Sequence, residues 1–577
     1  MPAPPKLNQR DSDLWSEYSS FDSTPRYPSG TRSSLATISA GKILFSFDAR
    51  DFPFLTADYP DSEDEEEKPG LKKKKRPKKP IVGCNPLSPR GCGNVLSLFL
   101  TIGGLVSLFV LYPVISFLNR TAASTLGGYN IGGINASGQI PEIRGNYGLI
   151  DLDTPKDAYT MRSWRDPSVR MNLVFSDEFN EEGRSFYPGD DPYWEAVDLH
   201  YWATGNLEWY DPKAVTTQGG ALVVTLSQKA THGLNYEGGM ITSWNKFCFT
   251  GGYIEASVMM PGVNNILGLW PAVWTMGNLG RAGYGATLEG VWPYTYDSCD
   301  VGTAPNQTIN GLPLAAAQTD GGGPLSYLPG QKLSRCTCNG EDHPGPKHPD
   351  GTFVGRAAPE IDIFEAQIDA RTLVGEVSQS AQWAPFNADY HWNDTPDNLI
   401  ISNTITSKQN TYIGGLTQQA TSVVTQTDQN CYERGTGCFS VYGFEYKPGF
   451  DNAYISWISN DAVAWTMLSG GLGPDADVQI SARPVSQEPM YIIVNLGMSR
   501  SFGTVDLAHI PFPVHMRLDY IRVYQPSNAI NVGCNPKNFP TTKYIRDHIQ
   551  AYTNPNLTTW VDDYRKPWPK NSLIDQC

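Results

Sequence analysis

Residues 359–365, Pro-Glu-Ile-Asp-Ile-Phe-Glu, place three carboxylates within one short and otherwise apolar segment that has the composition of a β-strand. Side chains alternate between the two faces of a strand, so Glu360 and Asp362 share a face, whereas Glu365 should point the other way. A one-residue β-bulge around residues 363–364 would return Glu365 to the face of the other two acids. The pattern therefore predicts a bulged strand that gathers three acids on one surface.

Such a surface has the groups that retaining glycoside hydrolysis requires. One carboxylate attacks the anomeric carbon, and a carboxylic acid about 5–5.5 Å away protonates the leaving oxygen. In this scheme Glu360 is the nucleophile and Glu365 the acid/base. Asp362 would hydrogen-bond Glu360 and hold like charge near both, which helps to keep Glu365 protonated near neutral pH. The alternative is a solvent-facing edge strand whose acids discourage aggregation.

Three further blocks surround this strand, at residues 251–262, 269–277 and 516–524. Together they resemble family 16 of the glycoside hydrolases, the laminarinase-like β-jelly rolls, over roughly residues 170–525. Residues 177–212 are similar to a narrower group, the fungal killer-toxin-resistance/SKN branch of membrane proteins associated with the synthesis of cell-wall β-1,6-glucan. The resemblance implies a concanavalin-like β-jelly roll that acts on β-glucan.

The rest of this region also reads as an all-β, antiparallel β-sandwich. Short alternating apolar runs, such as residues 221–226 and 490–496, are separated by Gly, Pro and Asn turns. Residues 280–358 form a long insertion dense in Gly, Pro and Cys, where simple family 16 hydrolases carry much less. We expect the insertion to reshape the cleft, so substrate preference does not transfer from the family. We expect residues 526–577 to pack back on the sandwich.

The chain contains 15 Trp and 29 Tyr residues, many for its length. Aromatic rings stack on the C–H faces of sugars while polar groups bind the hydroxyls. Trp270 and Trp274, in the resembling block, would flank the scissile bond unless they pack in the core. Asn206, Glu208 and Trp209 match a family position that contacts sugar hydroxyls. Trp383, His391 and Trp392 follow the acid/base strand and would line the acceptor side.

Residues 95–118 carry no charge and would rise about 36 Å as a helix, enough to cross a bilayer core of roughly 30 Å. The basic run at residues 72–79 precedes them, so the positive-inside bias predicts a type II signal anchor. A buried core helix is the alternative. Residues 1–94 are rich in Ser, Pro and Asp, which predicts a disordered cytoplasmic tail with short apolar islands that could serve sorting adaptors. Residues 119–169 would be a lumenal stalk.

Glycosylation sequons and cysteines agree with this orientation. All five sequons follow the anchor, at Asn119, Asn135, Asn306, Asn393 and Asn556; Asn119 lies too near the bilayer for modification, so we expect sugars on the other four. Eight of the ten cysteines also follow it, an even number suited to disulfides in an oxidising compartment. A local Cys431–Cys438 bridge is the first expectation.

The net charge of −15 and the pI near 5.0 exclude a nucleic-acid partner. Asp519 matches a position that coordinates a structural calcium ion in some family members, but one aspartate predicts no site. We expect no metal or cofactor to be required.

The leading hypothesis is a retaining β-glucan hydrolase or transglycosylase that contributes to β-1,6-glucan synthesis in the cell wall. It would travel through the endoplasmic reticulum and Golgi to the plasma membrane. One rival is a catalytically inactive glucan-binding or folding-assistance protein, which the long insertion at the cleft would favour. Another is a glycoprotein-processing accessory, which would need no intact acid pair.

Overall fold

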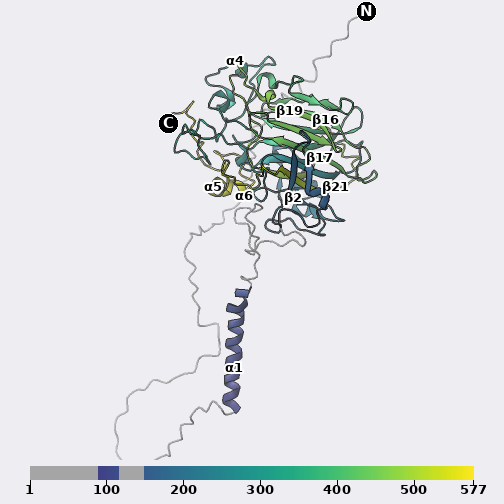
Figure 1. Cartoon of the computed structure of the whole chain (residues 1–577), viewed down its shortest axis with the longest axis vertical. Helices are drawn as coiled ribbons and strands as arrows, with labels where there is room; N and C mark the ends of the chain where they lie inside the picture. The colour runs from purple at the N-terminus through teal and green to yellow at the C-terminus, as the bar shows by residue number, and fades with distance from the viewer. Residues whose placement is uncertain (1–88, 113, 116–147) are drawn as a thin grey trace, which may run out of the picture. The chain divides into compact units, whose positions relative to one another are not determined.

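The computed structural model describes residues 89–112, 114–115 and 148–577 (Figure 1). The chain divides into two compact units, Met1–Pro113 and Val114–Cys577. In the first unit, helix α1 (Pro89–Val106) continues into the π-helical segment η2 (Ser107–Leu111). Among the described residues, none of the helices is both long enough and apolar enough to span a membrane.

The predicted tail, anchor and stalk lie partly in these helices and partly outside the described residues. The predicted tail is described only from Pro89, and residues 89–94 belong to α1 rather than to an unstructured segment. The predicted anchor overlaps α1 and η2, but residues 113 and 116–118 are outside the described part. So are tail residues 1–88 and stalk residues 119–147, with Asn119 and Asn135.

The second unit is an all-β sandwich, which confirms the predicted fold class. One sheet has ten strands, eight of them in the order β1-β2-β21-β9-β17-β18-β19-β13, with β7 pairing β21 and β6 pairing β7. Its strands are β1 (Thr160–Arg162), β2 (Arg170–Asp177), β6 (Val215–Thr217), β7 (Leu222–Leu226), β9 (Gly252–Met259), β13 (Leu399–Ile401), β17 (Ser440–Lys447), β18 (Tyr454–Ser459), β19 (Ala462–Leu468) and β21 (Val514–Pro526).

The other sheet has eleven strands, nine of them in the order β14-β16-β12-β11-β10-β20-β8-β5-β4, with β15 pairing β16 and β3 pairing β8. Among the described strands, all pairs are antiparallel except the parallel pair β5 and β8. Its strands are β3 (Glu195–Ala196), β4 (Leu199–His200), β5 (Glu208–Tyr210), β8 (Tyr236–Thr242), β10 (Trp270–Gly277), β11 (Glu360–Ile368), β12 (Gly375–Trp383), β14 (Ser407–Gln409), β15 (Gly414–Gly415), β16 (Gln418–Gln426) and β20 (Met490–Gly497).

Short helical turns occupy the connections between the strands. The α-helical turns are α3 (Gly285–Leu288), α4 (Leu314–Ala317), α5 (Thr542–Asp547) and α6 (Ile549–Thr553). The 3-10 turns are η3 (Lys156–Tyr159), η4 (Trp202–Thr204), η5 (Pro212–Ala214), η6 (Val301–Thr303), η7 (Pro305–Gln307), η8 (Ala388–Tyr390) and η9 (Ser469–Leu472).

The main core lies between the sheets. Ile361 and Ile363 of β11 are buried in the same apolar cluster as Phe444 of β17 and Ile455 of β18. Burial of such side chains contributes roughly 1.5–3 kcal/mol each, which holds β11 firmly against the facing sheet. The strand that carries the three acids is therefore a central, packed element and not the solvent-facing edge of the alternative interpretation.

The folded unit begins N-terminal to the predicted boundary at residue 170. Strand β1 pairs with β2, and the buried Glu445 accepts hydrogen bonds from Ser163 Oγ and from the Trp164 backbone N–H, both at 2.6 Å. Residues 148–169, predicted as stalk, are thus part of the sandwich because their polar backbone finds partners on the ten-stranded sheet.

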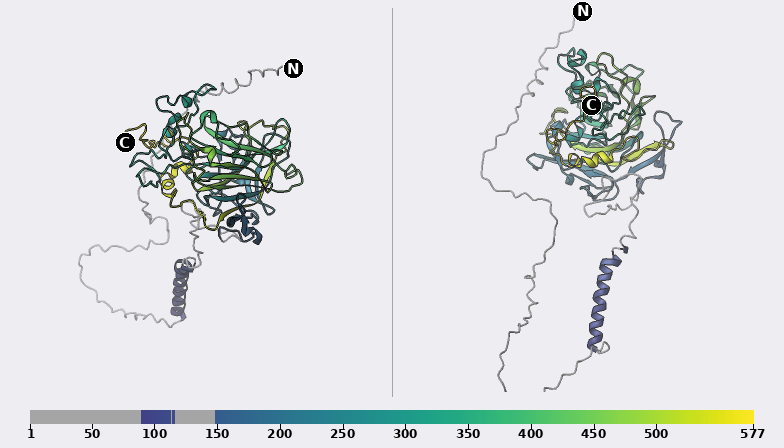
Figure 2. Two further views of the ribbon diagram at one scale, coloured as in Figure 1. Left: turned by 45° about the horizontal axis from the view of Figure 1, so that its top comes forward. Right: turned by 90° about the vertical axis from the view of Figure 1, so that its left-hand side faces the viewer.

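The insertion and the C-terminal extension lie at the same end of the sandwich (Figures 1 and 2). Four disulfides join the eight cysteines that follow the anchor region: Cys248–Cys534, Cys299–Cys336, Cys338–Cys577 and Cys431–Cys438. The predicted local Cys431–Cys438 bridge is confirmed, and two bridges connect the extension to the rest of the unit.

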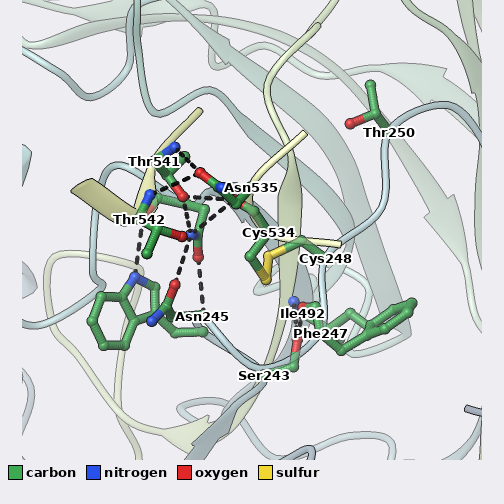
Figure 3. Close-up of a disulfide and its surroundings, with 12 residues drawn as sticks. Ser243, Asn245, Phe247, Cys248, Thr250, Ile492, Cys534, Asn535, Thr541 and Thr542 are labelled. Carbon is green, nitrogen blue, oxygen red and sulfur yellow. Dashed lines mark hydrogen bonds between the residues drawn. A yellow bond between two sulfur atoms is a disulfide. The ribbon is translucent and has the colours of Figure 1, made fainter. Parts of the chain in front are cut away.

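Figure 3 shows the Cys248–Cys534 bridge, where the loop after β8 meets the extension. Beside it, Asn535 Oδ1 accepts the backbone N–H groups of Thr541 and Thr542, at 2.9 and 3.0 Å, and so holds the start of α5 (Figure 3). The extension is therefore fixed covalently and by hydrogen bonds at the point where it leaves the last strand.

Candidate active site

The predicted bulge in β11 is confirmed by the strand register. Asp362 pairs with Ser380 of β12, and Glu365 pairs with Ser378, so three steps on β11 face two steps on β12. The pairing with β10 shifts at the same level. The extra residue reverses the alternation, and all three acids reach the same side of the sheet.

The carbonyls at the bulge are satisfied from within the core. Trp457 Nε1 donates to the Asp362 carbonyl oxygen at 2.8 Å, and Gln379 Nε2 donates to the Ile363 carbonyl oxygen at 3.0 Å. Both side chains are fully buried. Because an unpaired buried carbonyl is costly, these donors stabilise the bulge and with it the positions of the acids.

Each acid accepts a hydrogen bond from a different neighbour. Trp292 Nε1 donates to Glu360 Oε2 at 2.6 Å, Gln382 Nε2 to Asp362 Oδ2 at 3.2 Å, and Trp270 Nε1 to Glu365 Oε1 at 3.1 Å; the first contact was not anticipated from the sequence. Glu360 and Glu365 are partly exposed, whereas Asp362 is buried. The side chains of Glu360 and Glu365 therefore keep some contact with solvent.

Burial raises the pKa of all three carboxyl groups. The pKa of Glu360 is raised further by the charge of Glu365, while hydrogen bonds from Trp292 and Asp362 act to lower it. The pKa of Asp362 is raised by burial and by the charges of both glutamates. Burial and the two neighbouring charges thus favour the protonated form of Asp362. Burial, rather than the like charge that we expected from Asp362, raises the pKa of Glu365.

Trp292 belongs to the insertion, and the insertion holds it rigidly. Its backbone N–H donates to the Leu288 carbonyl at 2.9 Å, and Tyr294 forms an isolated bridge with Ala384, the residue after β12. The Ala358 N–H, two residues before β11 begins, donates to the Val291 carbonyl at 2.9 Å. The insertion therefore reaches the acids through one anchored indole.

A polar chain leads from the acids across β10 and β20 to β5. Trp274 Nε1 donates to Asn495 Oδ1 at 2.8 Å, and Asn495 Nδ2 donates to the Tyr210 hydroxyl at 3.3 Å. Asn206 Nδ2 donates both to this hydroxyl, at 3.0 Å, and to Glu208 Oε1, at 2.6 Å. Trp274 and Asn206 are therefore brought into one network on the acids' side of the sheet.

Glu208 is fully buried and holds this network in place through its hydrogen bonds. It accepts the Met498 backbone N–H at 2.9 Å, and burial raises its pKa to about 7.

Trp270 stacks on Phe502, with ring centroids 4.2 Å apart, beside a hollow of about 250 Å³ at the end of β11. Trp270 therefore forms a wall next to Glu365.

Four of the predicted sugar-binding residues lie elsewhere. Trp209 contacts Asp198 and stacks on His232, because strand alternation turns it away from Glu208. Trp383 and Trp392 are core residues: Trp383 is one position from the site-facing Gln382 and so enters the core. His391 is exposed at the end of η8.

The site also includes residues that the sequence patterns did not single out. Tyr201, Tyr412 and Tyr491 lie near enough to Glu360 for its charge to raise their pKa values, after the larger effect of burial. Tyr201 and Tyr412 lie in connections between strands, whereas Tyr491 lies on β20 at the same parity as Asn495. Asn495 and Gln382 could have been found from strand alternation: once the pairing of β20 and β12 with their neighbours is known, both positions face the same side of the sheet as the acids.

The sequons and potential metal ligands lie outside this cluster. Asn306, Asn393 and Asn556 are exposed, as attachment of sugars requires. Across the described ranges, one group of acids and thiols is close enough to hold a metal ion, and its two cysteines are the disulfide-bonded Cys431 and Cys438. Asp519 lies at a register irregularity between β21 and β9.

Comparison with known proteins shows which family and which relatives this chain resembles. The family model described as "Beta-glucan synthesis-associated protein SKN1/KRE6/Sbg1" matches residues 55–577. The beta-glucan synthesis-associated protein KRE6 of Saccharomyces cerevisiae is 45% identical over 499 residues, 85% of this chain and 64% of that protein. SKN1 of the same yeast is 46% identical over 431 residues, 74% of this chain and 53% of that protein.

A search of solved structures also matches the catalytic domain of an endo-1,3-beta-glucanase (laminarinase) from Thermotoga petrophila. It is 19% identical, with a TM-score of 0.35, and the alignment covers 62% of this chain and all of that one. This chain spans less than two thirds of the length of its two yeast relatives. By the match to the family model over most of its length, the chain belongs to the SKN1/KRE6/Sbg1 family of beta-glucan synthesis-associated proteins.

Proposed function

We propose that this protein is a retaining glycosidase or transglycosylase that acts on β-glucan and contributes to the synthesis of β-1,6-glucan in the fungal cell wall. One observation carries the proposal: the bulge that places Glu360, Asp362 and Glu365 on one side of a packed central strand. Two of these acids remain partly exposed, and each has an indole donor.

In the proposed reaction, a Glu360 oxygen attacks the anomeric carbon while Glu365 donates its proton to the glycosidic oxygen. The bond between that oxygen and the anomeric carbon breaks, which leaves a glycosyl ester on Glu360. Glu365 then takes a proton from the acceptor hydroxyl, whose oxygen attacks the same carbon and releases Glu360. Water as acceptor gives hydrolysis, and a sugar hydroxyl gives transfer.

The hydrogen bonds around the two glutamates do not by themselves separate their roles. Trp292 Nε1 donates to Glu360 and Trp270 Nε1 donates to Glu365, and burial raises the pKa of both groups. Glu360 is assigned as the nucleophile and Glu365 as the acid from the order of the acids along the strand in the family 16 pattern. The labelling experiment below tests this assignment.

The test replaces each glutamate with glutamine, which keeps shape and removes acid function. In a fungal strain that lacks the gene, Glu360→Gln and Glu365→Gln should fail to restore β-1,6-glucan, whereas the exposed Glu182→Gln should restore it. A fluorinated glucosyl trap should add its mass to the peptide that contains Glu360. Full restoration by both active-site variants would end the catalytic proposal.

A second candidate function rests on the Trp292 contact. An indole from the insertion lies at 2.6 Å from the proposed nucleophile, so the same contact could hold the site closed in an inactive glucan-binding or folding-assistance protein. That protein would bind glucan oligosaccharides without turning them over. Purified full-length protein incubated with β-1,3- and β-1,6-linked oligosaccharides, with products read by mass, separates the two functions.

We extend the proposal to location: a type II membrane protein with residues 170–525 on the lumenal or cell-surface side. The uncharged residues 95–118, the basic residues 72–79 and the four disulfides after them support this orientation. Protease added outside sealed microsomes should remove only the first 90 or so residues, and an endoglycosidase should increase the mobility of the whole protein. Protection of the N-terminal tail would reverse the orientation.

A further inference from the structure

A row of polar side chains crosses the eleven-stranded sheet from the catalytic strand to the loop between β14 and β15. Ser380 lies opposite Asp362, and its hydroxyl is 2.7 Å from that of Ser422 on β16. Asn410 Nδ2 donates to Ser422 Oγ at 3.1 Å, and Asn410 Oδ1 accepts the Tyr412 backbone N–H at 3.1 Å. Cross-strand partners share a face, so this row lies on the face that carries the acids.

Gln382 adds an unpaired acceptor beside this row. It pairs with Glu360 across β11 and β12, and its Nε2 donates to Asp362. Its Oε1 has no hydrogen-bond partner, although the residue is only 6% exposed. Gln382 therefore adds a polar amide next to Glu360 and Asp362 on the face that carries the acids.

Exposed tyrosines stand at the outer end of the row. Tyr412 is 51% exposed and Tyr327, from the insertion, is 60% exposed. The Tyr327 backbone N–H donates to the Leu416 carbonyl at 2.8 Å, which ties the insertion to the turn between β15 and β16. Tyr390 lies nearby and donates its hydroxyl to the Leu325 carbonyl at 2.8 Å.

Hydrogen bonds bring the segments of these tyrosines together. Tyr390 and Tyr327 are joined to residues 325 and 416, which lie in the insertion and in the turn after β15. The electrostatic influence of Tyr412 and Tyr327 on Tyr390, and of Glu365 and Glu360 on Tyr412, agrees with this proximity: burial and these neighbours raise the pKa of Tyr390 to about 12.

We propose that a β-glucan chain binds along this face from the three acids to Tyr412, Tyr390 and Tyr327, so that the insertion supplies part of its binding site. Aromatic planes for the C–H faces of sugars and polar groups for their hydroxyls are the two surfaces that a polysaccharide requires. Three strand spacings separate β11 from the Tyr412 loop, roughly 14 Å, which is long enough for several sugar units. The identity of the ligand rests on the proposed function.

Binding to a non-cleaving protein tests this site independently of catalysis. The full chain with Glu365→Gln is titrated with a β-1,3-linked and a β-1,6-linked glucohexaose by calorimetry. Tyr412→Ala and Tyr327→Ala, each added to this background, should weaken binding of at least one hexasaccharide roughly three- to tenfold, the loss of one stacking contact. Tyr412→Phe keeps the ring and should bind like the background. Tyr159→Ala removes an exposed tyrosine of the distant turn η3 and should also leave binding unchanged.

The results have distinct meanings. Tyrosine variants that keep the background melting temperature and the background affinity would overturn the proposal, as would a background protein that binds neither hexasaccharide. Binding that depends on Tyr412 and Tyr327 in a wild-type chain without turnover would leave this site in place and remove only the catalytic function.

Discussion

Replacing Trp292 with phenylalanine removes one hydrogen-bond donor from Glu360 and keeps a ring of similar shape in the insertion. A hydrogen bond to a charged group contributes about 1.5–3 kcal/mol, and the partial exposure of Glu360 favours the lower end of that range. Since one pKa unit corresponds to about 1.36 kcal/mol, the loss should raise the pKa of Glu360 by about one unit. The ionised nucleophile would then form only at higher pH.

The assay is the pH dependence of kcat/KM on a β-glucan oligosaccharide, or of the labelling rate with a fluorinated glucosyl trap. The acidic limb of the profile should move up by about one pH unit in Trp292→Phe, so activity on that limb falls about tenfold while activity above it changes little. Trp209→Phe is the matched control, because Trp209 Nε1 also donates to a carboxylate, Asp198, at 2.7 Å but away from the acids.

Two results would refute this reasoning about Trp292. If the acidic limb stays in place while the variant melts like wild type, the hydrogen bond does not tune Glu360. If activity rises instead of falling, the indole obstructs the nucleophile, and the second candidate function gains support. The direction of the change therefore separates a positioning contact from a blocking one.

Three further predictions concern the support of the site. Trp457→Phe leaves the carbonyl of Asp362 unpaired in the core and should lower the free energy of unfolding by about 1–3 kcal/mol in denaturant titration, with a parallel loss of any glucan activity. Replacing both Cys338 and Cys577 with serine removes one disulfide. With the Cys248–Cys534 and Cys299–Cys336 bridges in place, this disulfide closes a loop of about 100 residues, so the free energy of unfolding should fall by up to about 4.7 kcal/mol. An unchanged melting curve would contradict this. The raised pKa of Glu208, about 7, gives stability that is complete below its unfolded pKa and is lost as the pH rises to 7. Glu208→Gln should reduce the loss of stability between pH 4.5 and 7 by roughly 2 kcal/mol, and an identical pH dependence would show that Glu208 is not the group responsible.

The bulge could be predicted because it follows from a local rule. An odd separation between Glu360 and Glu365 cannot place both on one face of a regular strand, so shared chemistry required an extra residue. The all-β class followed in the same way from apolar alternation. The paired cysteines followed from their number and position, although sequence alone could connect only Cys431 with Cys438.

The rest of the site could not be predicted because it depends on tertiary contacts. Trp292 and Tyr327 lie in an insertion without periodicity, and only its folding brings them to the sheet. Trp383 and Trp392 were assigned to sugar on their residue type and nearness in sequence, but indoles fill cores as readily as they bind sugars. The site-facing position of Gln382 would have placed Trp383 on the core side.

The contact between Trp292 and Glu360 also depends on the C-terminal extension. The Trp560 backbone N–H donates to Glu289 Oε2 at 2.5 Å, and the buried Lys332 lies over the Trp560 ring with its Nζ 3.5 Å from the centroid. Glu289 is three residues before Trp292, so the extension braces the turn that directs the indole.

Strand β11 thus supplies the acids, and the insertion, held by the extension, supplies the indole that donates to Glu360. Donors that replace lost water favour the charged form of a partly buried carboxylate, so this contact acts directly on the proposed nucleophile. The insertion is for this reason better understood as a part of the candidate active site than as a cover over it.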